Sequence, residues 1–226
     1  MVSLRSHLAG VLIWLAVADP VMALDTNSVI DAIIAHQSVT KSWHAKFVQI
    51  RKLPSLKKAL KTPGKVWFQG SGEFRWELGD PARSVAIRSG EQITILSPRL
   101  RLAEVYPLGT DTAGPWRDAL ALLEVGFPRS RESLEDKFIL SQVEKIDRGH
   151  AVVLLPRKKS ARQFLTYIRM EFDAAHGLRA TEMAFSHGAR IRTEFSLVKQ
   201  NPSLDNALFD STVPEGYEVS RPLPVR

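Results

Sequence analysis

The stretch "GEFRWELGDP", residues 72–81, decides the fold class of this chain. Two aromatic residues, Phe74 and Trp76, alternate here with charged residues, and a Gly-Asp-Pro turn follows. Because successive side chains of a strand point to opposite faces, this alternation predicts a strand over 73–78 with one apolar and one charged face. Such a strand is half-buried, so the central question is what its aromatic face contacts.

Strand-like segments recur on both sides of this stretch, each bounded by Gly, Pro or a polar turn. Connections such as Ser89-Gly90 and His187-Gly188 are too short for parallel crossovers, so neighbouring strands are expected to pair as antiparallel hairpins. A sheet of about eleven strands has to curl. The sequence therefore predicts a mainly β fold with some helix, an incomplete (unclosed) antiparallel β-barrel with strands over 43–52, 65–69, 73–78, 83–88, 92–97, 100–106, 138–147, 151–155, 163–173, 178–186 and 189–199.

Two segments have the apolar periodicity of amphipathic helices. The first covers 27–37, where Ser28 and Asp31 fit a capping box. The second begins at Gly114-Pro115 and ends by Gly126, and a short polar turn is expected over 133–136. Both apolar faces are expected to be buried across the mouth or the concave face of the sheet. They consist of Val29, Ile30, Ile33 and Ile34 in the first segment and Trp116, Leu120 and Leu123 in the second.

The first 23 residues are typical of a cleavable secretory signal peptide. Arg5 precedes the apolar run 8–18, and Val21-Met22-Ala23 places small residues before a cleavage site. An apolar run of about 11 residues is shorter than the ~20 needed to cross a bilayer, which makes an uncleaved anchor the weaker alternative. We therefore expect a signal peptide at 1–23, a single domain at 24–226 and a location in the periplasm.

The chain has 31 Lys and Arg against 24 Asp and Glu, a formal net charge of +7. An exported protein rarely meets nucleic acid, so anionic membrane surfaces or acidic partners are the expected targets of this charge. One candidate contact lies in the expected loop 52–61, where leucines separate lysines; the alternative is a plain exposed hairpin connection. Its lysines are Lys52, Lys57, Lys58 and Lys61.

Motifs for catalysis or metal binding are weak. The chain has no cysteine, which excludes disulfides, a thiolate nucleophile and an acylated anchor on cysteine. Its histidines lack metal-ligand spacing, so no metal and no cofactor is expected. Ser55 and Lys58 match S-x-x-K, but Pro54 precedes them and the companion motifs are missing. We expect no enzyme, although an exported hydrolase using Ser55 or a carboxylate pair is the alternative from another class.

Several short motifs resemble the LolA family, the periplasmic carriers of outer-membrane lipoproteins. They are Phe47-Val48-Gln49, Phe74-Arg75-Trp76, Asp80-Pro81, Ser89-Gly90 and the closing segment Val213 to Val219. The resemblance extends from about residue 27 to 219. It implies an unclosed barrel with a helical lid over an apolar cavity, which agrees with the strand and helix pattern.

The resemblance also implies a function without chemistry. A carrier of this family receives the acyl chains of a lipoprotein from an inner-membrane ABC-type transporter and passes them to an outer-membrane receptor. We expect this protein to act as a monomer that binds acylated lipoproteins or lipids but no nucleic acid. The residues matching or adjoining the family's cavity positions are Phe47, Phe68, Phe74, Trp76 and Leu78. A glutamate at Phe74 is expected to weaken cargo uptake and to leave folding largely intact.

One departure separates this chain from the family pattern. Members often have a basic residue and a proline just before F-x-W, and the basic residue helps to latch the lid, whereas this chain has Gly70-Ser71. Arg75 is the candidate replacement for that latch. Because related proteins accompany lipid or glycolipid exporters, a shuttle for a free lipid is the second interpretation.

Overall fold

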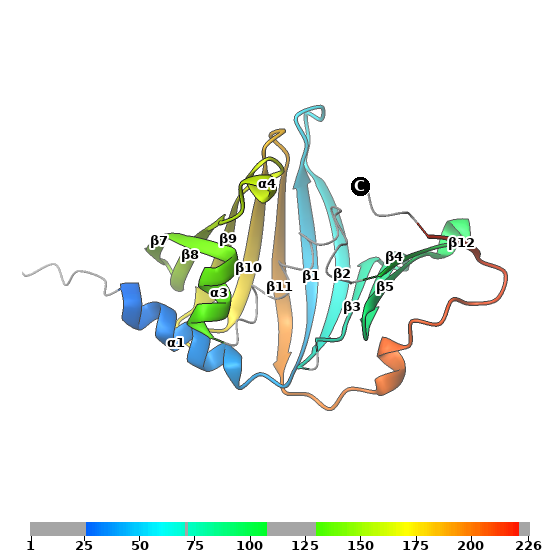
Figure 1. Ribbon diagram of the computed structural model, residues 1–226, viewed down its shortest axis with the longest axis horizontal. Helices are drawn as coiled ribbons and strands as arrows, with labels where there is room; N and C mark the ends of the chain where they lie inside the picture. Colours follow the sequence, from blue (N-terminus) through cyan, green and yellow to red (C-terminus); the bar gives the residue numbers. More distant parts are fainter. Residues whose placement is uncertain (1–25, 71, 108–129, 222–226) are drawn as a thin grey trace, which may run out of the picture.

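Twelve strands form one sheet in the computed structural model, which describes residues 26–70, 72–107 and 130–221 (Figure 1). The order across the sheet is β12-β6-β5-β4-β3-β2-β1-β11-β10-β9-β8-β7. The strands are β1 (Ser42–Lys52), β2 (Leu60–Gln69), β3 (Phe74–Gly79), β4 (Ala82–Ser89), β5 (Gln92–Ser97), β6 (Leu102–Pro107), β7 (Phe138–Ile146), β8 (Gly149–Pro156), β9 (Leu165–Asp173), β10 (Leu178–Phe185), β11 (Arg190–Gln200) and β12 (Glu218–Ser220).

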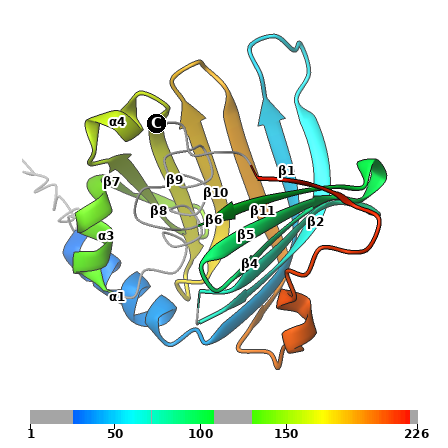
Figure 2. The ribbon, with the colours of Figure 1, turned by 45° about the vertical axis from the view of Figure 1, so that its right-hand side comes forward.

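The sheet is strongly curved but does not close, because β12 and β7 stand at its two edges (Figure 2). Consecutive strands pair as antiparallel hairpins within β1–β6 and within β7–β11. The two halves join where β1 pairs with β11. The predicted fold class, an unclosed antiparallel barrel, is therefore confirmed. The sequence pattern missed β12, a three-residue strand that runs parallel to β6.

The helices differ from the sequence prediction in detail. Helix α1 (Thr26–Ser38) matches the expected 27–37, but it begins before Ser28, so Ser28 is not its N-cap. The polar turn expected over 133–136 is wrong: these residues belong to α3 (Arg131–Lys137). Reciprocal hydrogen bonds between Ser130 and Ser133 cap its first turn and explain why a polar segment is helical. A one-turn helix, α4 (Lys159–Arg162), precedes β9.

Parts of the sequence prediction fall outside the described residues. The signal peptide at 1–23 and the second amphipathic helix, with Trp116, Leu120 and Leu123, belong to these parts. Of the lid helices expected from the sequence, α1 is therefore the one that the structure describes.

Helices α1 and α3 lie on the same side of the sheet, across its β7–β10 half (Figure 1). Val29, Ile30 and Ile33 of α1 are buried there with apolar side chains of β8 and β9. Each such side chain removed from water contributes roughly 1.5–3 kcal/mol, so this contact is the main force that holds α1 on the sheet. The predicted packing of Val29, Ile30 and Ile33 against the sheet agrees with this position, and Ile34 packs at the edge of the same cluster.

The opposite, convex face of β4–β6 is covered by the C-terminal segment. Val85 and Ile87 are buried there, and Val213 and Tyr217 pack against their cluster. A 3-10 helix, η2 (Asn206–Phe209), anchors the segment through the buried Phe209. The closing motif singled out in the sequence therefore covers the outside of the curved sheet.

Candidate functional site

The five predicted cavity residues lie on one face of three adjacent strands. In the β1–β2 register Phe47 stands opposite Gly64, and in the β2–β3 register Gly64 stands opposite Leu78. Phe68 stands opposite Phe74 in the same register. Because every second residue shares a face, Phe47, Phe68, Phe74, Trp76 and Leu78 all point to the concave side.

Aromatic rings form the centre of this face. The ring centroids of Phe47 and Trp76 are 4.3 Å apart, and the Phe195 ring packs edge-on against both, at 6.4 and 6.5 Å. Trp43 meets Phe195 at 5.1 Å. We call this group of Trp43, Phe47, Trp76 and Phe195 the aromatic cluster. Trp43 and Phe195 were missed as site residues in the sequence, although alternation in their strands could have indicated them.

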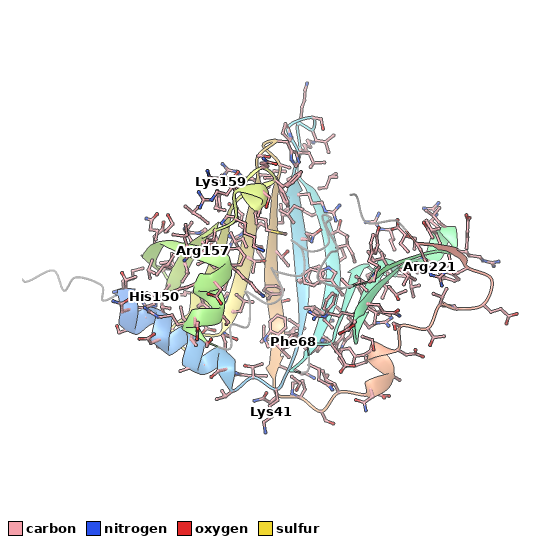
Figure 3. All side chains as sticks on the ribbon, in the orientation of Figure 1. Lys41, Phe68, His150, Arg157, Lys159 and Arg221 are labelled. Carbon is pink, nitrogen blue, oxygen red and sulfur yellow. The ribbon has the colours of Figure 1, made fainter. Side chains whose placement is uncertain are left out.

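Phe74 extends the apolar face towards β5. It is buried with Ile93 and Ile95. Phe68 and Trp76 pack against this group and also against the group of Trp43 and Phe47, so they join the two. Figure 3 labels Phe68 near one end of β2. The apolar side chains of these groups therefore form one continuous patch on the concave face of β1–β5 and β11. Arg88 of β4 stands opposite Phe74 on the same face.

A narrow apolar cavity separates α1 from the sheet. Its volume is about 10 Å³, close to that of a single water molecule. Its walls are Ile30, Ile33, Ile34, Leu134, Val152, Leu154, Met170 and Phe172. An acyl chain does not fit in this space unless α1 moves away from the sheet.

Arg131 of α3 fastens the first half of α1. Its Nη1 donates to Oδ1 of Asn27 at 3.0 Å and its Nη2 donates to the Asn27 carbonyl at 3.3 Å. Its Nε lies 3.2 Å from Oδ1 of Asp31, an ion pair whose geometry falls short of a hydrogen bond. Three atoms of one guanidinium thus hold two positions of α1, one turn apart.

Arg75 does not have this position. It stands between Phe74 and Trp76 in β3 and therefore points to the convex side. Its Nε donates to Glu77 at 2.7 Å and its Nη1 donates to the Leu208 carbonyl at 3.3 Å. The prediction that Arg75 latches a helical lid disagrees with these contacts, because they anchor the C-terminal segment on the other face.

The convex face of the other half is held by charged side chains. Arg192 forms a bidentate pair with Glu171, at 2.8 and 2.9 Å, and Arg169 pairs with Glu144 at 2.6 Å. The hydrogen bonds and the charge of Arg192, followed by the hydrogen bond and the charge of Arg169, lower the pKa of Glu171 despite its partial burial. The strong alternation of charge and apolar character in β9 and β11 thus separates an ionic outer face from an apolar inner one.

Two histidines lie close together at the ends of β8 and β9. Burial, followed by the nearby charges of His176 and Lys145, lowers the pKa of His150. The His176 carbonyl accepts a hydrogen bond from Nε2 of Gln37 in α1, at 2.9 Å. The contact to Gln37 ties the last turn of α1 to the β9–β10 turn.

The residues considered for catalysis are not arranged for it. Ser55 is exposed in the non-helical β1–β2 connection, so the one-turn spacing that S-x-x-K needs is missing. Glu77 pairs with Arg75, while Glu132 and Asp136 line an open polar groove on α3. Within 26–70, 72–107 and 130–221, no group of three His, Asp or Glu side chains is placed to hold a metal ion. No helix in these ranges is long and apolar enough to cross a membrane.

Comparison with known proteins identifies the family. The sequence model described as "Outer membrane lipoprotein carrier protein LolA" matches residues 38–212. The chain belongs to the LolA family. The match includes β1–β6 and β7–β11, so the whole apolar face of this LolA-family protein lies within the family region.

Relatives with the same name cover most of the chain. An outer-membrane lipoprotein carrier protein of Dechloromonas aromatica is 26% identical over 180 residues, 80% of this chain and 81% of that protein. One of Methylobacillus flagellatus is 24% identical over 211 residues, 91% and 98% of the two chains. The crystal structure of an uncharacterized conserved protein from Thermus thermophilus aligns with a TM-score of 0.50 at 11% identity, over 87% and 98% of the chains. That likeness supports the fold alone.

Proposed function

We propose that this LolA-family protein is a periplasmic carrier that binds the acyl chains of lipoproteins on its apolar concave face and brings them from the inner to the outer membrane. The observation that supports this most is the continuous apolar face formed by β1–β5 and β11 next to a helix that few polar contacts hold. Relatives named as outer-membrane lipoprotein carriers supply the cargo class. No catalytic step is part of the proposal.

Physical chemistry favours such a carrier. Each methylene removed from water contributes roughly 0.8 kcal/mol, so shielding part of an acyl chain offsets the cost of taking it from a membrane into water. The aromatic cluster offers rigid rings that lose little side-chain entropy when a chain packs on them. The cargo then passes to a partner whose binding site for acyl chains is more apolar than the concave face of this protein. We propose an inner-membrane ABC-type transporter as the donor and an outer-membrane lipoprotein receptor as the acceptor.

Opening of α1 is the proposed entry step. The apolar underside of α1 covers the sheet, and the cavity of about 10 Å³ beneath it expands when the helix lifts. Val29, Ile30, Ile33 and Ile34 then become wall residues for the acyl chain. In this proposal Arg131, and not Arg75, is the polar latch that sets how often α1 opens.

Replacing Arg131 with alanine is expected to loosen α1. Loss of the two bonds to Asn27 and of the ion pair to Asp31 removes about 1–2 kcal/mol of local stability, or roughly 5- to 30-fold. Hydrogen exchange at the α1 amides measures this change. Arg148→Ala, at an exposed arginine of the β7–β8 turn, is the control. Equal exchange in both variants contradicts the latch.

Mass spectrometry of material that co-purifies with the protein from the periplasm tests the function. Triacylated lipoproteins at near-stoichiometric amounts support the lipoprotein carrier. Free phospholipid or glycolipid instead identifies a lipid shuttle, the second interpretation. Protein without any bound lipid, even after Arg131→Ala opens α1, contradicts both.

A further inference from the structure

Three connections meet at one end of the sheet. They are the β1–β2 hairpin, the segment with α4 between β8 and β9, and the β10–β11 turn (Figures 1 and 2). Ser186 of the β10–β11 turn donates to the carbonyls of Gln163 and Phe164, at 2.6 and 2.9 Å. On its other side Gly188 approaches Pro54 so closely that an added Cβ would lie 3.1 Å from Cγ of Pro54. We call this continuous surface, formed by 51–61, 157–164 and 186–190, the basic rim.

The charge of the basic rim has one sign. Its segments contain ten of the chain's 31 Lys and Arg and none of its 24 Asp and Glu. The exposed cations include Lys57 and Lys58 on one connection and Lys158 and Lys159 on another. The excess of positive charge in the whole chain, +7, is therefore concentrated at this end.

Large apolar side chains stand among these lysines. Phe164 is 62% exposed, Leu60 48% and Leu56 43%. All three belong to the basic rim, and each has a cation within two residues of it in the sequence. Exposed apolar groups among basic residues are typical of surfaces that enter the headgroup region of a membrane.

We propose that the basic rim docks the protein on an anionic lipid bilayer. The lysine heads contact lipid phosphates, and Phe164, Leu56 and Leu60 insert between the headgroups. This goes beyond the carriage of cargo, because it assigns a second lipid contact, to headgroups, on a part of the molecule distinct from the aromatic cluster.

The kind of cation favours a membrane over an acidic protein. Arginine binds carboxylates through a two-pronged guanidinium, whereas lysine is a point charge that needs no fixed geometry. The rim's Arg157 and Arg162 already donate to backbone carbonyls of Glu135 and Pro156, at 2.6 and 2.7 Å. Lysines therefore supply most of the exposed charge, and they suit a fluid layer of phosphates.

Co-sedimentation with vesicles tests the proposal. The mature protein is expected to bind vesicles of phosphatidylglycerol and phosphatidylcholine, to bind phosphatidylcholine alone far less, and to dissociate as salt is added. Combining Lys57→Gln, Lys58→Gln, Lys158→Gln and Lys159→Gln is expected to weaken binding more than 100-fold, at roughly 5-fold per lysine. Phe164→Ser is expected to remove most of the binding that persists at high salt.

A matched variant distinguishes an effect of the rim lysines on vesicle binding from an effect of the protein's net charge. Lys41, Lys46, Lys145 and Lys199 are also exposed, and Lys41 lies at the opposite end of the sheet from Lys159 (Figure 3). Changing these four to Gln lowers the net charge equally and is expected to retain vesicle binding. Equal losses in the two variants, or binding to soluble poly-glutamate but not to vesicles, would overturn the proposal.

Vesicle binding by the basic rim and lipopeptide binding by the concave face are measured separately, so either proposal can fail without the other. The rim variant is expected to bind a triacylated lipopeptide as well as the unmodified protein does, because the aromatic cluster is unchanged. A rim variant that loses lipopeptide binding, with its circular dichroism unchanged, contradicts the separation of the two lipid contacts. Failure of lipopeptide binding in the unmodified protein, with vesicle binding intact, contradicts the carrier and leaves the rim supported.

Discussion

Replacing Trp76 with glutamate is expected to weaken binding of a triacylated lipopeptide by about 100-fold, or ~3 kcal/mol. Trp76 packs against Phe47 at 4.3 Å and lies on the concave face. An acyl chain that covers this position has to desolvate the carboxylate, which costs several kcal/mol. Isothermal titration calorimetry with the lipopeptide measures this loss of affinity.

The neighbouring Trp67 offers a matched control. It lies in β2 beside Trp76 in space but points to the other face, where it stacks on His44 at 4.9 Å. Trp67→Glu is therefore expected to retain binding. If both tryptophan variants bind the lipopeptide equally well, the concave face is not the cargo site.

The structure also corrects the expectation for Phe74. The sequence pattern predicts that a glutamate there leaves folding largely intact, but Phe74 is only 4% exposed and packs with Ile93 and Ile95. An uncompensated carboxylate in that core destabilises the fold itself. Trp76 is partly exposed, so a carboxylate there keeps contact with water and tests the same surface at a lower cost in stability.

Replacing Gly64 with alanine is expected to lower the free energy of unfolding by about 3 kcal/mol or more. An added Cβ would lie 2.2 Å from Cζ of Phe47 and 2.3 Å from the carbonyl oxygen of Glu77. Phe47 could relieve one of these clashes by changing its rotamer. The other involves the backbone of the paired strand β3, so relief requires β3 to move relative to β2.

Urea unfolding of the variant measures this loss. Gly70→Ala is the control. Its added Cβ would lie 3.1 Å from the nearest atom, the carbonyl oxygen of Lys41, so the free energy of unfolding is expected to fall by about 1 kcal/mol or less. A similar small loss at Gly64 would mean that the aromatic cluster tolerates a shift of Phe47 and β3. The close contact between Phe47 and Gly64 would then not fix the shape of the concave face.

Much of the local structure follows from the sequence. Alternation in 73–78 correctly predicted a strand with an apolar and a charged face, and spacing predicted α1 within one residue at each end. These signals are local, because a strand repeats every two residues and a helix every 3.6. Short polar elements lack such periods. The polar α3 was therefore mistaken for a turn, and the three-residue β12 was not recognised.

The expected loop 52–61 also shows that local sequence patterns do not reveal which distant segments lie side by side. This loop is too long at its second end, because Leu60 and Lys61 belong to β2. Lys52 ends β1, as the expected strand over 43–52 has it. Its sequence indicated a basic surface, but Lys158 and Lys159 come from another connection far along the chain. Their position beside it follows from the contacts of the β10–β11 turn.

The sequence by itself determined which side of each strand is apolar, where most strands begin and end, and that the sheet has to curl. Only the tertiary structure decided that Phe195 reaches Trp76, that Arg131 rather than Arg75 fastens α1, and that three basic connections form one rim. The reason is physical. Local periodicity depends on backbone geometry over a few residues, whereas these contacts depend on the pairing of β1 with β11, which brings together the two halves of the chain.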